Sequence, residues 1–154
     1  MKVSDLMRTF YLTASPEMSL RKANELMHQF NSDYIIVMEG KKLHGLVTAS
    51  DLFRQILPAY EEVMRDETYW FNPASLEERT DEISKKKIKD IMVIDSFKVH
   101  QSMLVVQAGA LMISKKVKQL PVIDGNGDLV GVISFRDITW GLLMKQVIPD
   151  EPKV

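Results

Sequence analysis

Apolar residues recur along the chain with two periods, and each period predicts a different element. Between positions 20 and 30 they fall at helical spacing, which predicts an amphipathic helix capped by Ser19. Two apolar runs, 34–38 and 43–48, flank a turn at Gly40 and predict a β-hairpin. The predicted buried face of the helix consists of Leu20, Ala23, Leu26, Met27 and Phe30.

The same order of elements occurs a second time. Segment 3–7 reappears as segment 88–92, an offset of 85 positions, and one extra residue in the second hairpin turn then shifts the offset to 86. Two copies of one supersecondary unit explain this pattern. Each copy reads as strand, helix, strand, strand and helix, which predicts an α+β fold. The predicted strands are 10–13, 34–38, 43–48, 97–100, 120–123 and 129–134, and the helix that closes each copy is 51–57 or 137–147. We expect a first repeat at 1–57, a charged helical linker at 58–85, a second repeat at 86–148 and a tail at 149–154.

Composition excludes several classes of function. The apolar fraction of 45% and charged fraction of 27% are ordinary for a soluble globular protein. A net charge of −1 gives no general attraction to nucleic acid or anionic membranes, so neither partner is expected, although lysines cluster at 85–89 and 115–118. The absence of cysteine excludes disulfides, thiolate metal sites and cysteine nucleophiles. No segment reads as a membrane span or a signal peptide, and we expect a cytoplasmic location.

Both hairpins run into one motif: Gly, two apolar residues, Ser or Thr, two variable residues, and Asp. It occupies 45–51 and 131–137. The strand ends at Thr48 or Ser134, where a hydroxyl and the free N–H groups of a helix start suit a phosphate oxygen. Three residues later, Asp51 or Asp137 can accept hydrogen bonds from the two hydroxyls of a ribose. Glycine at 45 and 131 would let a flat ring approach the backbone.

A second interpretation of the motif needs no ligand. Thr48 and Ser134 can act as helix N-caps, with the two aspartates favourable to the helix dipole. Duplication does not decide between the two interpretations, because a duplicated cap is still a cap.

Other polar groupings do not predict a site. Segment 124–128 is rich in Asp and Gly but lacks the sixth-position Gly and twelfth-position Glu of a calcium loop, so it reads as a hairpin turn. The three histidines are far apart, and no metal site is expected. No nucleophile elbow or Walker loop is present, so we expect no catalytic residues and no enzyme activity.

The chain resembles CBS domains, the family named for cystathionine β-synthase. The resemblance rests on the repeat order, the Asp-Leu-Met and Asp-Ile-Met starts, Leu120-Pro121-Val122-Ile123-Asp124 and both Gly-to-Asp motifs, and it covers about 1–57 and 86–146. It implies a stand-alone pair of repeats, or Bateman module, packed by pseudo-twofold symmetry through the sheets. Such pairs bind AMP, ADP, ATP or S-adenosylmethionine in clefts between the repeats, are regulatory, and require no cofactor.

The resemblance also implies roles for single residues. Asp51 and Asp137 would hold ribose hydroxyls, while Thr48 and Ser134 would face phosphate, with Arg136 as a further phosphate contact. The adenine would lie among Thr9, Ser32 and Tyr34, or among Ile94, Val117, Gln119 and Leu120. Which lining serves which aspartate stays open.

The two copies are unequal. Lys115, Lys116 and Lys118 stand at the positions of Phe30, Asn31 and Asp33, and the first copy lacks the proline found at position 121. We therefore expect two unequal sites, one of them tighter for phosphorylated ligands. We also expect a homodimer formed through the helices and an effector protein on a separate chain. The alternative is a structural or scaffolding dimer with vestigial clefts.

Overall fold

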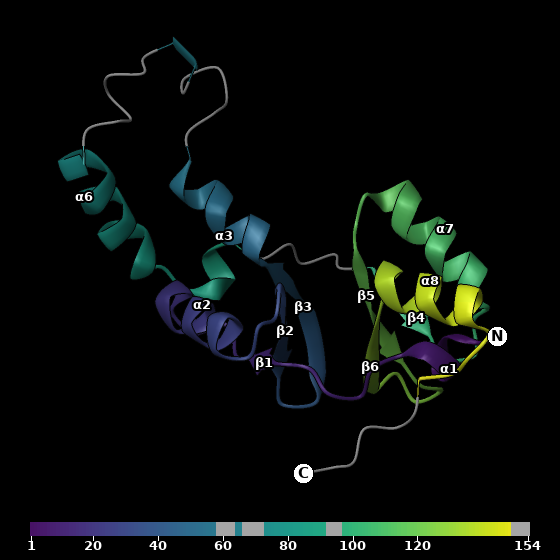
Figure 1. Cartoon of the computed structure of the whole chain (residues 1–154). Coiled ribbons are helices and arrows are strands. Elements are labelled where there is room, and N and C mark those ends of the chain that lie inside the picture. The colour runs from purple at the N-terminus through teal and green to yellow at the C-terminus, as the bar shows by residue number, and fades with distance from the viewer. Residues whose placement is uncertain (58–63, 66–72, 92–96, 149–154) are drawn as a thin grey trace. The chain divides into compact units, whose positions relative to one another are not determined.

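The structure is a computed structural model that describes residues 1–57, 64–65, 73–91 and 97–148. It is a mixed α+β fold with two three-stranded sheets, ordered β1-β2-β3 and β4-β5-β6 (Figure 1). Helices α2 and α3 lie beside the first sheet with α6 packed against them, and α1, α7 and α8 lie together beside the second sheet. No helix within the described residues is long and apolar enough to cross a membrane.

Two compact units divide the chain. The β1–β3 unit contains Leu12–Glu39 and His44–Ile94. Its elements are β1 (Thr13–Ala14), α2 (Leu20–Gln29), β2 (Tyr34–Glu39), β3 (Lys42–Thr48), α3 (Ala49–Ile56), α6 (Pro73–Ser84) and the 3₁₀ helix η1 (Ile88–Asp90).

The β4–β6 unit contains Met1–Tyr11, Gly40–Leu43 and Asp95–Val154. Strand β4 runs parallel to β5, and β5 and β6 form an antiparallel hairpin. Its elements are α1 (Val3–Leu6), β4 (Val99–His100), α7 (Val105–Lys115), β5 (Gln119–Ile123), β6 (Leu129–Ser134) and α8 (Phe135–Met144).

The apolar helical faces form the two cores. Leu20, Ala23 and Met27 of α2 are buried against β2 and β3, and Val105, Ala108 and Met112 of α7 are buried in the matched cluster. Ser19 caps α2 by accepting a hydrogen bond from the Lys22 N–H at 3.1 Å, as predicted. The prediction for Phe30 is wrong: α2 ends at Gln29, and the Phe30 side chain is 48% exposed.

The acidic loop between β5 and β6 is a turn, as predicted. Asp124 Oδ1 accepts hydrogen bonds from the N–H groups of Asn126 at 2.8 Å and Asp128 at 3.0 Å. Gly127 has φ +83°, which glycine adopts without strain. The Asp124 carboxylate therefore shapes the backbone of the turn.

The start of each repeat packs on the body of the other. The Val3 N–H donates to the Met103 carbonyl at 2.8 Å, and the Ile88 N–H donates to the Met18 carbonyl at 2.9 Å. Val3 and Leu6 are fully buried in the β4–β6 core, and Ile88 is fully buried in the β1–β3 core. Segments 3–6 and 88–90 are thus exchanged between the two sequence repeats, and each compact unit contains residues of both repeats.

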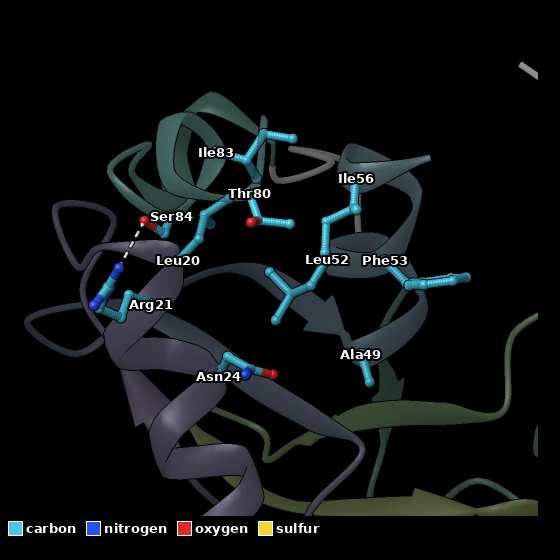
Figure 2. Close-up of a pocket in the computed structure, with 10 residues that line it drawn as sticks. All are labelled: Leu20, Arg21, Asn24, Ala49, Leu52, Phe53, Ile56, Thr80, Ile83 and Ser84. Carbon is cyan, nitrogen blue, oxygen red and sulfur yellow. Dashed lines mark hydrogen bonds between the residues drawn. The ribbon is translucent and has the colours of Figure 1, made fainter. Parts of the chain in front are cut away.

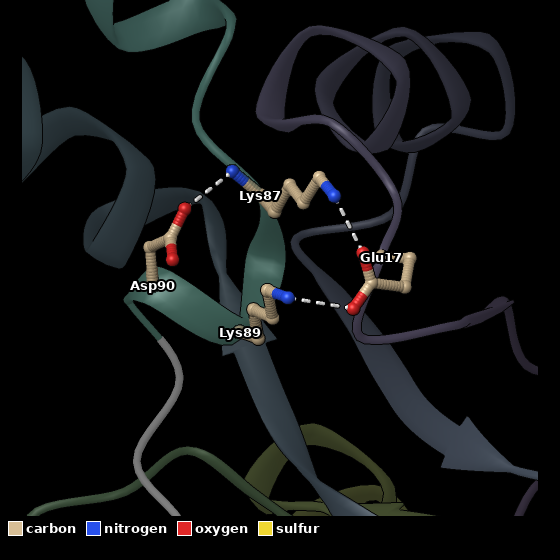
Figure 3. Close-up of polar contacts among 4 residues, drawn as sticks. All are labelled: Glu17, Lys87, Lys89 and Asp90. Atoms are coloured by element: carbon tan, nitrogen blue, oxygen red, sulfur yellow. Dashed lines mark hydrogen bonds and ion pairs between the residues drawn. The ribbon is translucent and has the colours of Figure 1, made fainter.

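One of the two exchanged segments is also held by charge (Figure 3). Glu17 accepts hydrogen bonds from Lys87 Nζ at 2.6 Å and Lys89 Nζ at 2.8 Å. These two hydrogen bonds lower the pKa of the Glu17 carboxyl from 4.5 to about 2. The positions matched to Glu17 and Lys89 in the other copy are Ser102 and Ser4, so the charge cluster belongs to one copy only.

Candidate functional site at two strand-to-helix junctions

The first junction joins β3 to α3. Thr48 is the N-cap of α3: its hydroxyl accepts a hydrogen bond from the Asp51 N–H at 3.2 Å, and Asp51 Oδ2 accepts one from the Thr48 N–H at 2.8 Å. This reciprocal arrangement is a capping box. Asp51 Oδ1 lies 3.3 Å from Nη1 of Arg54, whose side chain is 74% exposed, while the Asp51 side chain is 29% exposed. The carboxylate thus sits at the edge of solvent.

The second junction joins β6 to α8 and is built differently. Ser134 again caps the helix by accepting from the Asp137 N–H at 3.2 Å, but its hydroxyl also donates to Asp137 Oδ2 at 2.6 Å. Asp137 Oδ1 accepts a hydrogen bond from Arg8 Nε at 2.9 Å. The Asp137 side chain is only 3% exposed, so this is a buried carboxylate paired with a half-buried guanidinium.

The capping interpretation of the motif is therefore confirmed at both junctions. It does not exclude a ligand, because the hydroxyl, the carboxylate and the helix start all remain in one place. Asp51, 29% exposed, can accept further hydrogen bonds from a ligand, whereas a ligand at Asp137, 3% exposed, would first have to move a neighbouring group.

The second motif needs a glycine at position 131 for a different reason from the one predicted. A Cβ at Gly131 would lie 2.8 Å from the Arg8 carbonyl oxygen and 2.9 Å from Met7 Sδ. Arg8 and Val132 exchange two backbone hydrogen bonds here, of 2.8 and 2.9 Å. The expectation that this glycine makes room for a flat ring is wrong for Gly131, because the chain's own segment 7–8 fills that room.

Both junctions are held in the same way, by the residue just before the first strand of each hairpin. The Ala49 N–H donates to the Asp33 carbonyl at 2.9 Å, and the Phe135 N–H donates to the Lys118 carbonyl at 3.1 Å. Basic residues are concentrated at the second junction: Lys118, the exposed Arg136 and Arg8. The first junction has Asp33 and Ser50 where the second has Lys118 and Arg136.

The remaining predicted residues divide between the units. Thr9, Val117, Gln119 and Leu120 lie in the β4–β6 unit with Ser134, Arg136 and Asp137, whereas Ser32 and Tyr34 lie in the β1–β3 unit with Thr48 and Asp51. Thr9 thus belongs to a different compact unit from Ser32 and Tyr34, with which the prediction grouped it. Ile94 lies outside the described residues.

Within the β4–β6 unit the predicted residues differ in access. Gln119 pairs with Ser134 across the β5–β6 ladder, which places it directly beside the α8 cap. Leu120 is 1% exposed and packs in the core cluster, so its side chain supports the strand and offers no open surface. Val117 is half-buried against the same cluster, and Thr9 is exposed.

Arg8 is the site residue that sequence reasoning missed. The position matched to it in the second copy is Val93, so a charge one residue before Thr9 has no counterpart in the other copy. That asymmetry was visible in the sequence. Its pairing with Asp137, 129 positions away, was not.

A separate pocket of about 390 Å³ lies among α2, α3 and α6 (Figure 2). Its walls are mainly apolar, and Arg21 Nη2 donates to Ser84 Oγ at 3.3 Å on its rim. The described residues that line it include none of the predicted ligand-binding residues. They are Leu20, Arg21, Asn24, Ala49, Leu52, Phe53, Ile56, Thr80, Ile83 and Ser84.

Comparison with known proteins gives a family and a fold. The model of the CBS domain family matches residues 3–58 and 88–143. Among curated proteins, the inosine-5'-monophosphate dehydrogenase of Korarchaeum cryptofilum is 28% identical over 84% of this chain, which spans 22% of that enzyme. The chain also spans 60% of protein MK0525 of Methanopyrus kandleri, at 27% identity over 88% of the chain.

Two solved structures of CBS pairs are similar in fold. CBSX2, a protein of Arabidopsis thaliana solved in complex with AMP, has a TM-score of 0.71 at 21% identity, covering 94% of this chain and 97% of that one. The CBS domain pair of MJ0100, solved with 5'-methylthioadenosine and S-adenosyl-L-methionine, has a TM-score of 0.69 at 19% identity, covering 95% and 98%.

Proposed function

Because the chain belongs to the CBS domain family, we propose that it is a regulatory module that binds an adenine nucleotide or another adenosyl compound and signals to a partner protein. The observation that carries this proposal is the pair of strand-to-helix junctions. Each presents a hydroxyl, a carboxylate and a helix start within one turn. These are the groups that a ribose and its phosphate need.

The assignment of roles follows the chemistry of each group. Asp51 and Asp137 would accept the ribose hydroxyls, and Thr48 and Ser134 would face the phosphate with the helix start. Gln119, beside Ser134, would contribute to the adenine lining at Asp137 together with Thr9, because both lie in the same compact unit as Asp137. Tyr34 lies in the unit of Asp51 and would serve that site.

The ligands of similar structures support the adenosyl class. CBSX2 was solved with AMP and MJ0100 with S-adenosyl-L-methionine, and the chain matches nearly the full length of both. The dehydrogenase match covers only 22% of that enzyme, so it lends no support to catalysis by this chain. The proposed module therefore has no reaction of its own and needs no cofactor.

We further propose that the module acts as a homodimer joined through its helices. The packed pair α7 and α8 leaves large apolar side chains exposed, among them Ile113 at 71% and Leu143 at 75%. Exposed apolar surface of this kind is typical of association surfaces. Sedimentation velocity would give twice the 17.7 kDa chain mass for the dimer and 17.7 kDa for a monomer.

One observation favours a second function, a structural or scaffolding dimer that binds no ligand. Both aspartates already have protein partners, since Asp51 accepts from the Thr48 N–H and Asp137 from Arg8. Two helix caps would account for both motifs without any adenosyl compound.

A thermal-shift panel separates the two functions. A ligand that binds the native state stabilises it by RT ln(1 + [L]/Kd), about 2.7 kcal/mol at a concentration of 100 Kd. The sensor is expected to melt at a higher temperature with at least one of AMP, ADP, ATP or S-adenosylmethionine, and not with GMP or CMP. No shift with any of the four adenosyl compounds would leave the scaffold as the function.

A further inference from the structure

The ribose-accepting carboxylate of the second junction is occupied by the protein itself. Arg8 Nε donates to Asp137 Oδ1 at 2.9 Å, and the Ser134 hydroxyl donates to Oδ2 at 2.6 Å. The Arg8 side chain is 36% exposed and the Asp137 side chain is 3% exposed. Each carboxylate oxygen can accept a second hydrogen bond, but with only 3% of the side chain exposed a ribose has no open approach to Asp137 unless a neighbouring group such as the Arg8 guanidinium moves.

The backbone around Arg8 holds its guanidinium beside Asp137. Arg8 and Val132 form an antiparallel bridge with two hydrogen bonds, and the missing Cβ of Gly131 allows the Arg8 carbonyl to lie against β6. Segment 3–6 just before it is buried in the same unit through Val3 and Leu6. Arg8 is thus fixed at the head of α8 by the fold, unlike a surface arginine that rests on a carboxylate by chance.

The free-energy cost of displacing Arg8 from Asp137 depends on the charge of the ligand. A guanidinium separated from a buried carboxylate loses a charged hydrogen bond, which is costly unless another anion replaces the carboxylate. A neutral nucleoside brings only hydroxyls. A phosphorylated nucleoside brings an anion with the geometry that arginine binds in a bidentate way, next to a helix start that also favours negative charge.

We propose that Arg8 makes the site at Asp137 select phosphorylated adenosine ligands over neutral and cationic ones. In the empty protein it pairs with Asp137, and with a nucleotide bound it pairs with the phosphate. The inference rests on the proposed function, because it concerns the specificity of that same site. Adenosine and S-adenosylmethionine are then the disfavoured ligands.

The first junction supplies a matched control. Arg54 Nη1 lies 3.3 Å from Asp51 Oδ1, but Arg54 is 74% exposed and is three residues away on the same helix. Water can replace such a surface partner with little change in free energy. Arg54→Gln therefore removes an arginine that lies beside Asp51 but is not held there by the fold.

The test is calorimetric titration of the full chain with AMP and with adenosine, followed at the site that D137N abolishes. In the wild type AMP binds more tightly than adenosine. R8Q is expected to reduce the ratio of the two affinities by about tenfold, the scale of one charged hydrogen bond, by weakening AMP binding while adenosine binding stays or tightens. R54Q, which changes the first junction, is expected to keep the wild-type ratio at the site that D51N abolishes.

The outcomes that overturn the inference are distinct from those that overturn the function. If R8Q weakens AMP and adenosine equally, or leaves both unchanged, Arg8 has only a structural role and the inference fails while the function stands. If the wild type binds neither AMP nor adenosine, the inference fails, and the function fails with it only if ADP, ATP and S-adenosylmethionine also give no thermal shift. Should R8Q not fold, R8K carries the test, since a lysine keeps the charge but cannot bind phosphate in a bidentate way. Its affinity ratio must then fall between one and the wild-type value, and an unchanged ratio overturns the inference.

Discussion

At the scale of single residues, one motif has produced two different carboxylates. Asp51 completes a capping box at the edge of solvent, whereas Asp137 is buried and paired with an arginine from another part of the chain. The motif residues do not explain the difference. It comes from Arg8, which Gly131 and Val132 hold against β6.

The first prediction concerns Gly131. Gly131→Ala places a Cβ 2.8 Å from the Arg8 carbonyl and 2.9 Å from Met7 Sδ, and because one of these atoms is backbone, segment 7–8 must move. We expect a loss of about 1–3 kcal/mol in the free energy of unfolding, the usual range for overpacking. Denaturant unfolding measures it.

Gly109→Ala is the matched control. It lies inside α7, and its Cβ would be 3.8 Å from Ile138 Cδ1, an ordinary contact. Alanine in a helix interior is better than glycine by about 0.5–1 kcal/mol, so this variant should be more stable than the wild type. Equal effects at the two glycines would contradict the close approach of segment 7–8 to Gly131.

At the scale of elements, the exchanged segments are the main departure from a simple pair of repeats. Segment 3–6 completes the core beside α7 and α8, and segment 88–90 completes the core beside α2. The matched hydrogen bonds, from Val3 to Met103 and from Ile88 to Met18, show that the two copies use one design. Each repeat therefore depends on the residues with which the other repeat begins.

Leu6→Ala tests this dependence. Leu6 is fully buried, so its truncation is expected to cost about 2–5 kcal/mol of unfolding free energy. Hydrogen exchange should show the lost protection mainly in α7, β6 and α8, which belong to the second repeat. Ile88→Ala, the counterpart, should instead expose α2, β2 and β3. Lost protection confined to each variant's own sequence repeat would contradict the exchange.

The Glu17 cluster gives a prediction about pH. The carboxyl has a pKa of about 2 against an ordinary 4.5, so its pairing stabilises the fold above pH 4.5 and is lost as the pH falls through about 2. Removing both partners in a Lys87→Gln, Lys89→Gln variant should raise the pKa of Glu17 towards 4.5. An NMR titration of the side-chain carboxyl measures this, and a midpoint that the double substitution leaves unmoved would show that the lysines are not the cause.

The elements that the sequence could predict are those set by interactions between residues close together in the chain. Helix α2 and the hairpins were predicted closely, since Ser19 and the turns at Gly40 and Asp124 act locally. Strand β1 was expected at 10–13 and is Thr13–Ala14, because its extent is set by pairing with Ile36 and Val37 of β2. The exchange was not predictable, because segments 3–7 and 88–92 carry the same pattern and either would fit either body. The pairing of Arg8 with Asp137 depends on that exchange.

At the scale of the whole molecule, the two junctions make two unequal candidate sites within a CBS pair. The site at Asp137 has three basic residues near the helix start: Arg8, Lys118 and Arg136. At the site of Asp51, Asp33 stands at the position of Lys118 and Ser50 at the position of Arg136. Positive charge favours phosphate. We therefore propose that the site at Asp137 is the tighter one for nucleotides, in agreement with the inequality expected from the sequence.

The most direct measurement of the central claim is calorimetric titration of AMP into three proteins: the wild type, D51N/D137N and D5N/D90N. The control pair is matched, because Asp5 and Asp90 accept backbone hydrogen bonds from Lys2 at 2.7 Å and Lys87 at 2.9 Å, as a capping aspartate does, but lie outside the proposed sites. The account predicts that D51N/D137N weakens AMP binding about 10- to 100-fold per site, the scale of charged hydrogen bonds, while D5N/D90N binds as the wild type does. An AMP affinity that is unchanged in D51N/D137N, or that falls equally in both double variants, would contradict the claim that these carboxylates hold the ligand.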